Sequence, residues 1–396
     1  MEIRKALPED KNTIIKLWDY CFNTDSDGFR KHYFNNIYSP ENTIVSLKNG
    51  IITTSFQLNP YQFSFEGKEI DTKYIVGISS FPEFRGDGSV YHIFNHIFNH
   101  LYDSEMPFVF LMAIDYGLYR PYGFSSIMDK SILSGKTKNL YQKTEKKYKF
   151  IPVSKKSDKK SIEKLTAYYN LTMKNNYSDY IIRNKKNFYN NLEELFSDNG
   201  YAAYLENNGE IAGYLFYYFD QDKIVVKEML YDNSNVLKEI LKFVYNHNTQ
   251  TPVFEIRDDF PKTTSLFLPN PREVKWEIMP FLMARVINLK SFLSLINIQN
   301  QINDEIKLQI VDKNIKENNC LCILKPEGIF YEQPDRGKNW DISIDISLLP
   351  SLFFGYISPE EGMRQSHLYQ SNSKEKINDF FTCFNKSKNM FFNEYV

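Results

Sequence analysis

The chain has 396 residues, enough for two or three domains of ordinary size. Its 42% hydrophobic and 24% charged residues exclude wholesale disorder, and its net charge of −1 argues against a general nucleic-acid binder. No signal peptide and no run of about 18 apolar residues is visible, so we expect a cytoplasmic protein that does not enter a membrane.

The first third of the chain predicts the order strand, helix, hairpin, strand, helix, strand. The ranges expected for these elements are 1–6, 8–21, 43–58, 73–80, 89–103 and 108–114. Asn49-Gly50 supplies the hairpin turn. Apolar residues at helical spacing define the helix at 89–103. They are Val90, Ile93, Phe94, Ile97, Phe98 and Leu101.

A Lys- and Ser-rich stretch at 135–164 predicts a solvated connection between domains, although a lysine cluster that contacts phosphates is an alternative. Beyond it a similar order of helices, hairpin, strand, helix and strand returns, with Asn208-Gly209 at the hairpin turn. The ranges are 160–173, 192–196, 201–219, 223–231, 236–247 and 253–257. Two copies of one architecture indicate an internal repeat at the level of pattern.

After Pro280 the pattern changes to a smaller module of strands and helices. The ranges are 283–293, where a strand runs into a helix, then strands at 306–311, 320–324 and 340–346 and helices at 348–355 and 374–383. The final residues include Phe391, Phe392 and Tyr395, an apolar tail that could be buried, although a surface terminus remains an alternative.

Neither the cysteines nor the histidines predict a metal site. Cys320 and Cys322 are two apart on one strand, no second pair completes a zinc site, and we interpret them as reduced structural thiols. His92, His96 and His100 recur every four residues on the polar side of their helix, which we interpret as a solvated face.

The segment that carries chemistry runs from Ile78 to Tyr91, with the sequence Ile-Ser-Ser-Phe-Pro-Glu-Phe-Arg-Gly-Asp-Gly-Ser-Val-Tyr. A strand leads into a glycine turn that opens a helix. This geometry points backbone N–H groups and the positive end of a helix dipole at one place, where a pyrophosphate fits. Gly86 and Gly88 would let the backbone approach the anion closely.

This segment resembles the acetyl-CoA motif of the GNAT superfamily, Arg/Gln-x-x-Gly-x-Gly/Ala after the central strand. Arg85 and Gly88 match the motif. Val90 stands where a small residue is usual, and Asp87 places a negative charge in an anion-binding turn. Both departures suggest weaker cofactor binding.

The resemblance extends over about 390 residues to the enhanced intracellular survival (Eis) acetyltransferases. It implies a mixed α/β fold with two tandem GNAT-like domains and a sterol-carrier-protein-like domain. We expect the first GNAT domain at 1–150, a degenerate second one at 151–284 and the third domain at 285–396. The family also implies a homo-oligomer, a trimer or a hexamer.

In that family a tyrosine on the loop after the next strand protonates the departing CoA thiolate. The segment Ile114-Asp-Tyr-Gly-Leu-Tyr-Arg-Pro-Tyr-Gly-Phe124 matches the loop and places Tyr119 in this role, with Tyr116 and Tyr122 as nearby alternatives. A phenol of pKa about 10 and a thiol of pKa about 8.5 are close enough for proton transfer.

The family also uses the α-carboxylate of its last residue as a general base, which here implies Val396. A carboxylate of pKa about 3.5 is a weak base unless burial raises the pKa. Asp25, Asp27 and Glu394 could form an acidic pocket for a cationic amine, although each could equally be exposed loop charge.

The resemblance implies that acetyl-CoA is the co-substrate and that backbone groups bind it. The implied contacts are Ile78, Ser79, Ser80, Arg85, Gly86, Asp87, Gly88, Ser89, Val90, Tyr91, Ile114 and Asp115. Strand addition would hold the pantetheine arm and the helix dipole the pyrophosphate. The implied acceptor is a primary amine on a polyamine, an aminoglycoside-like molecule or a lysine side chain.

Two other classes of function remain open. One is an aminoacyl or long-chain acyl transferase on the same tandem fold, which would need a wider groove or a basic surface for tRNA. The other is a non-enzymatic binder of lipids or small molecules with a decayed acetyltransferase domain, which Asp87 and Val90 favour to some degree. We expect no nucleic-acid and no membrane partner.

Overall fold

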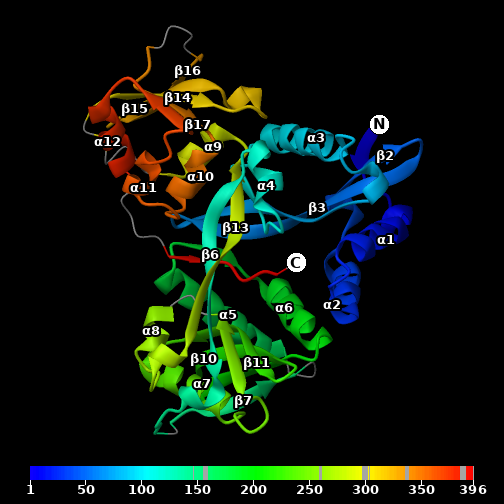
Figure 1. Cartoon of the computed structure of the whole chain (residues 1–396), viewed down its shortest axis with the longest axis vertical. Helices are drawn as coiled ribbons and strands as arrows, with labels where there is room; N and C mark the ends of the chain where they lie inside the picture. Colours follow the sequence, from blue (N-terminus) through cyan, green and yellow to red (C-terminus); the bar gives the residue numbers. More distant parts are fainter. Residues whose placement is uncertain are drawn as a thin grey trace.

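The computed structural model describes residues 1–145, 147–154, 159–257, 261–296, 302, 304–334, 339–383 and 389–395. Figure 1 shows an N-terminal unit at upper right, a middle unit below it and a C-terminal unit at upper left. The N-terminal unit comprises β1 (Glu2–Lys5), α1 (Lys11–Cys21), α2 (Asp27–His32), β2 (Thr43–Lys48), β3 (Ile51–Phe65), β4 (Lys68–Ser80), α3 (Ser89–Asp103), β5 (Phe108–Leu111), α4 (Tyr116–Tyr119) and β6 (Ser125–Lys136).

The middle unit comprises β7 (Lys149–Val153), α5 (Lys159–Asn176), β8 (Asp179–Ile182), α6 (Lys185–Ser197), β9 (Tyr201–Asn207), β10 (Glu210–Asp220), β11 (Lys223–Tyr231), α7 (Ser234–Tyr245), β12 (Val253–Arg257), α8 (Pro261–Ser265) and β13 (Lys275–Val286). The C-terminal unit comprises α9 (Leu289–Ser294), β14 (Ile306–Val311), β15 (Cys320–Lys325), β16 (Gly328–Glu332), β17 (Ile342–Asp345), α10 (Leu348–Phe353), α11 (Pro359–Met363), β18 (Tyr369–Ser371) and α12 (Lys374–Thr382), and the chain ends with β19 (Met390–Phe391).

One sheet continues through the N-terminal and middle units, in the order β1-β2-β3-β4-β5-β13-β6-β12-β11-β10-β9-β7. β13, from the end of the middle unit, lies antiparallel between β5 and β6. β6 continues beyond that region and pairs through its last residues with β12. β6 and β13 therefore run from one unit into the other, as the centre of Figure 1 shows.

Both predicted hairpins form where the sequence places their turns. Lys48 pairs with Ile51 across Asn49-Gly50, and Asn207 pairs with Glu210 across Asn208-Gly209. The predicted stripe of α3 is also confirmed, since Ile93, Phe94, Ile97, Phe98 and Leu101 are all buried, with Val90 half-buried at the edge of the same core.

The strands β4 and β5 separate at one end, which opens the sheet. They pair in parallel only where Lys73–Ile75 meets Val109–Leu111, whereas β4 stays paired with β3 as far as Ser80. Gly77 has φ +58°, and a Cβ there would lie 1.9 Å from Gln57 Oε1, so this irregular position in β4 requires glycine. One edge of β4 from Val76 onward is left without β5 as its neighbour.

The tail of the chain passes between the N-terminal and middle units. β19 pairs in parallel with β8, which in turn pairs with β3. Phe391 belongs to the core of the middle unit, whereas Phe392 belongs to the core that holds Tyr74 and Phe110. The expectation of a buried tail is confirmed for residues 391–394.

The C-terminal unit is a separate sheet in the order β16-β15-β14-β17-β18, with α9 to α12 packed against it. Its apolar core continues into that of the N-terminal unit, because Phe354 contacts the rings of Phe65, Phe108 and Phe110.

The stretch at 135–164 is more structured than its composition predicts. β6 extends to Lys136, β7 occupies 149–153, and α5 begins at Lys159. Lys149 is exposed while Val153 is buried. The lysines that the structure describes in this stretch lie on the solvent side of elements whose other side packs inward.

Candidate active site

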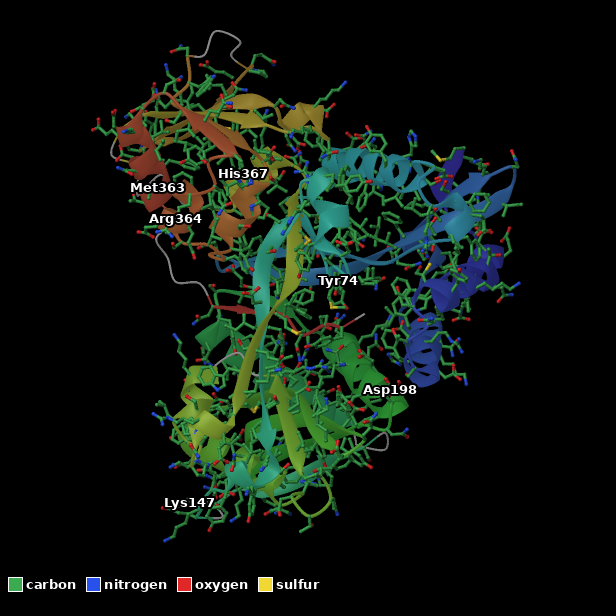
Figure 2. All side chains as sticks on the ribbon, viewed as in Figure 1. Tyr74, Lys147, Asp198, Met363, Arg364 and His367 are labelled. Carbon is green, nitrogen blue, oxygen red and sulfur yellow. The ribbon has the colours of Figure 1, made fainter. Side chains whose placement is uncertain are left out.

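The opening between β4 and β5 leads into a cleft of about 780 Å³ between the N-terminal and middle units. Figure 2 labels Tyr74 and Asp198, one residue from each wall. The N-terminal wall also includes Trp18, Asp25, Gly77, Ile78, Ile114 and Tyr119. The middle unit adds Glu194, Tyr218, Asp220 and Arg257, and the tail adds Tyr395. Three parts of the chain that are distant in sequence therefore form one cavity.

The glycine turn has the backbone geometry that an anion site needs. After β4, a 3-10 helix at Pro82–Phe84 leads to Gly86 and Gly88, with φ of +82° and +85°, and Gly88 is the N-cap of α3. A Cβ at Gly86 would meet no protein atom within 4 Å, so positive φ rather than crowding by the protein explains the glycine. The first N–H groups of α3 lie at this turn.

Asp87 already occupies part of that anion site. Its Oδ1 accepts a hydrogen bond of 2.8 Å from the N–H of Ser89, and hydrogen bonds from Ser89 hold the pKa of Asp87 below its ordinary value. An ionised carboxylate at a helix N-terminus stabilises the helix but repels a second anion. Val90 is half-buried and Tyr91 is exposed beside it.

Replacing Asp87 with asparagine is expected to lower the KM for acyl-CoA about two- to fivefold, because the side-chain oxygen that accepts from Ser89 stays while the negative charge is removed. Steady-state kinetics with acetyl-CoA measure this change. Asp103→Asn, at the opposite end of the same helix, is the matched control and should leave the KM unchanged. An unchanged KM in Asp87→Asn would show that the carboxylate does not oppose the cofactor.

The residues at the end of β4 are held in place from the β3 side. The hydroxyls of Ser79 and Ser80 lie 3.0 Å from those of Ser55 and Thr54. The Nε of Arg85 donates to the carbonyl of Ser80 at 3.2 Å, which ties the turn back to the strand. The opposite edge of the strand faces the cleft, where Ile78 is part of the lining.

Tyr119 enters the cleft from α4. Asp115 caps this helix through a 2.8 Å hydrogen bond from the N–H of Gly117. Tyr119 is 9% exposed and its ring packs near Phe94 and Phe124. Burial raises the pKa of Tyr119 to about 12, with a smaller contribution from Asp115. The phenol therefore stays protonated and available as a hydrogen-bond donor at neutral pH.

The two alternative tyrosines do not line the cleft. The hydroxyl of Tyr116 is buried without a hydrogen-bond partner among the residues that the structure describes. Tyr122 packs its ring against Phe94, 4.3 Å between centroids. Ile114 is 78% exposed and lines the cleft, whereas Asp115 acts as the cap of α4.

In comparisons with known proteins, each of the three units matches a family profile of its own. Profiles described as "Acetyltransferase (GNAT) domain" match residues 2–127 and 180–286, and a "Sterol carrier protein domain" profile matches 289–392. The chain carries two GNAT acetyltransferase domains and a sterol carrier protein domain. These matches make this tandem GNAT protein an acyltransferase, and GNAT domains use an acyl-CoA co-substrate.

Solved structures show the same fold over the whole length of the tandem GNAT protein. A probable N-acyltransferase from Enterococcus faecalis has a TM-score of 0.80 at 20% identity, covering 96% of this chain and 95% of its own. A GCN5-related N-acetyltransferase from Anabaena variabilis has a TM-score of 0.78 at 16% identity, covering 98% of both chains. Eis1 from Mycobacterium abscessus has a TM-score of 0.75 at 12% identity, covering 100% of both. No curated protein sequence matches.

The fold predicted from the sequence is thereby confirmed, with tandem GNAT domains in a mixed α/β architecture and a sterol-carrier-protein-like domain. Among the described residues no helix is long and apolar enough to cross a membrane. The same residues contain no group of three or more His, Cys, Asp and Glu side chains that could hold a metal ion.

The tail of the tandem GNAT protein is fixed by a buried charge network in the second GNAT domain. Val396 lies outside the described residues. Arg183 donates to Glu228 at 2.7 and 2.9 Å and to Glu394 at 2.8 Å, and all three side chains are at most 3% exposed. Burial alone would raise the pKa of Glu228, but Arg183 and further hydrogen bonds hold it below its ordinary value.

Two cations surround the next residue of the tail. Lys227 Nζ and the guanidinium carbon of Arg257 lie 5.2 and 4.8 Å from the centre of the Tyr395 ring. Tyr395 and Tyr119 line the same cleft. The network and the cations together bring the tail of the third domain into the site of the first.

The acidic residues that line the cleft differ from those predicted from the sequence. Asp25 lines it and accepts a 2.8 Å hydrogen bond from Trp18. Asp27 is exposed and pairs with Arg30, and Glu394 belongs to the network of Arg183, so neither lines this cleft. Burial raises the pKa of Asp25 above its ordinary value, and the nearby charge of Asp198 adds to the shift.

Sequence reasoning missed the carboxylates that the second GNAT domain contributes. They are Glu194, Asp198 and Asp220. Glu194 is paired with Lys227 at 2.5 Å and Asp220 with Lys223 at 3.4 Å, whereas Asp198 accepts a hydrogen bond from Ser26. Asp198 comes near Asp25 only because α2 packs against α6, and no local sequence pattern predicts that contact.

Proposed function

We propose that the protein transfers the acetyl group of acetyl-CoA to a primary amine. Two observations support the proposal: the open edge of β4 and Tyr119 line one cleft, and the glycine turn that opens α3 follows β4 directly. In this arrangement the pantetheine arm extends along Ile78–Ser80 as an added strand. The pyrophosphate lies at Gly86–Tyr91, at the N-terminus of α3.

The reaction proceeds by direct attack. The neutral amine forms a C–N bond with the thioester carbonyl, whose oxygen a backbone N–H near Ile78–Ser80 polarises. The C–S bond then breaks, and Tyr119 donates a hydrogen bond or its proton to the leaving thiolate. With a pKa of about 12, Tyr119 is a weaker acid than a free phenol, so stabilising the developing thiolate is the larger part of its role.

The Val396 carboxylate accepts the proton that the attacking amine loses. The support for this part is the position of Tyr395, which lines the cleft with Lys227 and Arg257 beside its ring. Positive charge keeps a carboxylate in the ionised form that can accept a proton, although it also lowers the pKa of that carboxylate and so its strength as a base. The boundaries at residues 150 and 284, an oligomeric assembly and a cytoplasmic location belong to the same proposal.

The acceptor is an amine that carries more than one positive charge. Asp25 and Asp198 line the cleft from the two GNAT domains. Burial and the nearby charge of Asp198 raise the pKa of Asp25, and a cation bound beside both carboxylates would stabilise their ionised forms. A polyamine, an aminoglycoside-like molecule or a lysine with a neighbouring cation has this charge pattern.

Release of CoA from acetyl-CoA in the presence of spermidine, an aminoglycoside and a lysine peptide tests the proposal directly. Turnover that requires the amine, with an acetylated amine identified by mass spectrometry, supports it. An absence of turnover, together with no calorimetric binding of acetyl-CoA, contradicts it and favours the ligand-binding alternative.

Replacing Asp198 with asparagine is expected to raise the KM for spermidine about fivefold, because one partly exposed ion pair is lost. The KM for a monoamine such as benzylamine should change little. Asp27→Asn, an exposed carboxylate on α2 outside the cleft, is the control and should alter neither constant. Equal KM changes for both amines would contradict a role for Asp198 in binding the distal charge.

A further inference from the structure

A second cavity lies between the first GNAT domain and the C-terminal domain. Its volume is about 710 Å³, and none of its lining residues belongs to the acetyl-CoA cleft. One wall is the segment that directly follows Tyr119, including Arg120, Gly123 and Ser125. The opposite wall comes from the C-terminal domain, where Figure 2 labels His367. Cavities of this size hold small-molecule ligands in other proteins.

Hydrogen bonds and a buried ion pair keep the two walls in a fixed arrangement. Arg285 pairs with Asp312 at 2.7 Å, with both side chains 0% exposed, and its Nε donates to the carbonyl of Tyr122 at 2.8 Å. Asn314 donates to the carbonyl of Pro121 at 3.1 Å. Ser351 donates to the carbonyl of Ser126 at 2.8 Å. The cavity is therefore formed before any ligand enters, which reduces the cost of binding.

The lining combines an apolar floor with positive charge. Pro121 is exposed, and Ile357 and Leu368 are half-buried, so these three side chains provide apolar surface. Arg120 and Lys313 are exposed cations in the lining, and within the described residues Arg120 forms no ion pair. Negative charge is largely compensated, because Arg285 neutralises Asp312 and Lys313 lies 3.8 Å from Asp345.

One polar atom of the lining lacks a partner. The Oγ of Ser125 is buried and has no hydrogen-bond partner among the described residues. Buried hydroxyls in folded proteins nearly always have a partner, so an orphan beside a cavity indicates a group supplied from outside the chain. Water alone could bond the Ser125 hydroxyl. The apolar surface and the cation of Arg120, which has no ion pair among the described residues, favour a larger anionic ligand instead.

We infer that this cavity is a second ligand site, which binds a small amphipathic anion. The apolar body of the ligand contacts Ile357 and Leu368, its anionic group lies toward Arg120, and an oxygen of the ligand bonds the hydroxyl of Ser125. The ligand would touch the segment between Tyr119 and β6 without entering the acetyl-CoA cleft. This site is independent of the proposed transferase activity.

Calorimetry of the full chain with octanoate, octanol and octylammonium tests the charge and the apolar character together. We expect saturable binding of octanoate with a Kd below about 1 mM, and at least tenfold weaker binding of the two other probes. Saturating acetyl-CoA should leave octanoate binding unchanged. Failure of octanoate to saturate, equal binding of octanol, or displacement by acetyl-CoA would each overturn the inference.

Two variants test whether octanoate binds in this cavity. Arg120→Glu changes an exposed side chain and is expected to weaken octanoate binding at least tenfold, whereas Arg272→Glu, an exposed arginine outside the cavity, should not. Ser125→Val removes the orphan hydroxyl without adding a polar group and should weaken binding several-fold. Wild-type affinity for octanoate in Arg120→Glu would overturn the assignment. Because the side chain of Arg120 is exposed, its substitution should leave the fold intact, so a loss of binding reports on the cavity.

Discussion

Replacing Tyr119 with phenylalanine is expected to lower kcat for acetyl transfer about 100- to 1,000-fold, the range typical for loss of a general acid. Removing the hydroxyl leaves the ring and its packing against Phe94 and Phe124, so the KM for acetyl-CoA and the fold should be retained. CoA release measured by a thiol reagent gives kcat, and calorimetry gives the affinity for acetyl-CoA.

The matched control is Tyr116→Phe, three residues earlier on the same helix. Its buried hydroxyl has no partner in the described part of the chain, so its loss should leave kcat within about twofold. The pH profile gives a second test. Tyr119 acts while protonated and would lose activity as pH rises through a pKa of about 12, so it should contribute no alkaline limb below about pH 11. Similar kcat losses in both variants would contradict the assignment.

Replacing Arg183 with methionine is expected to destabilise the protein by about 3 to 5 kcal/mol. The substitution fills much of the same space but leaves Glu228 and Glu394 buried without their cation. Because Glu394 belongs to the tail, activity should fall together with stability. Urea denaturation followed by fluorescence measures the loss of stability, and initial rates below the transition measure the loss of activity.

A second substitution separates charge from packing. Adding Glu228→Gln to Arg183→Met should recover part of the stability, because it removes one of the buried charges left unpaired. Arg30→Met, whose partners Asp19 and Asp27 are partly or fully exposed, should cost less than about 1 kcal/mol. A wild-type unfolding midpoint in Arg183→Met would contradict a structural role for the network.

Local signals in the sequence predicted local structure well. The Asn-Gly pairs defined both hairpins, the apolar stripe defined α3, and strands such as Val253–Arg257 and Ile306–Val311 have the predicted bounds. The glycine turn was predictable for the same reason, since its backbone geometry depends on residues within one short segment. Tyr119 was found only through the family resemblance, because nothing local distinguishes it from Tyr116 and Tyr122.

Long-range pairings could not be predicted. β13 pairs with β5 and β6 across a separation of well over a hundred residues, and its exposed half, including Trp276 and Ile278, has no alternating pattern of burial. β8 and β19 are too short to give a periodic signal. The acidic side of the cleft was missed because Asp25 and Asp198 meet only when two domains dock.

Adjacent residues of the tail, Phe391 and Phe392, fill two different cores. During synthesis, the ribosome therefore releases the first GNAT domain long before the ring that packs against Tyr74 exists. Until residue 392 emerges, both GNAT domains have a gap in their apolar interior, and chaperones and proteases can recognise that gap. A chain stopped by a nonsense codon after α12 would leave both gaps open permanently. Degradation of such a product would then act as quality control on complete translation of the message.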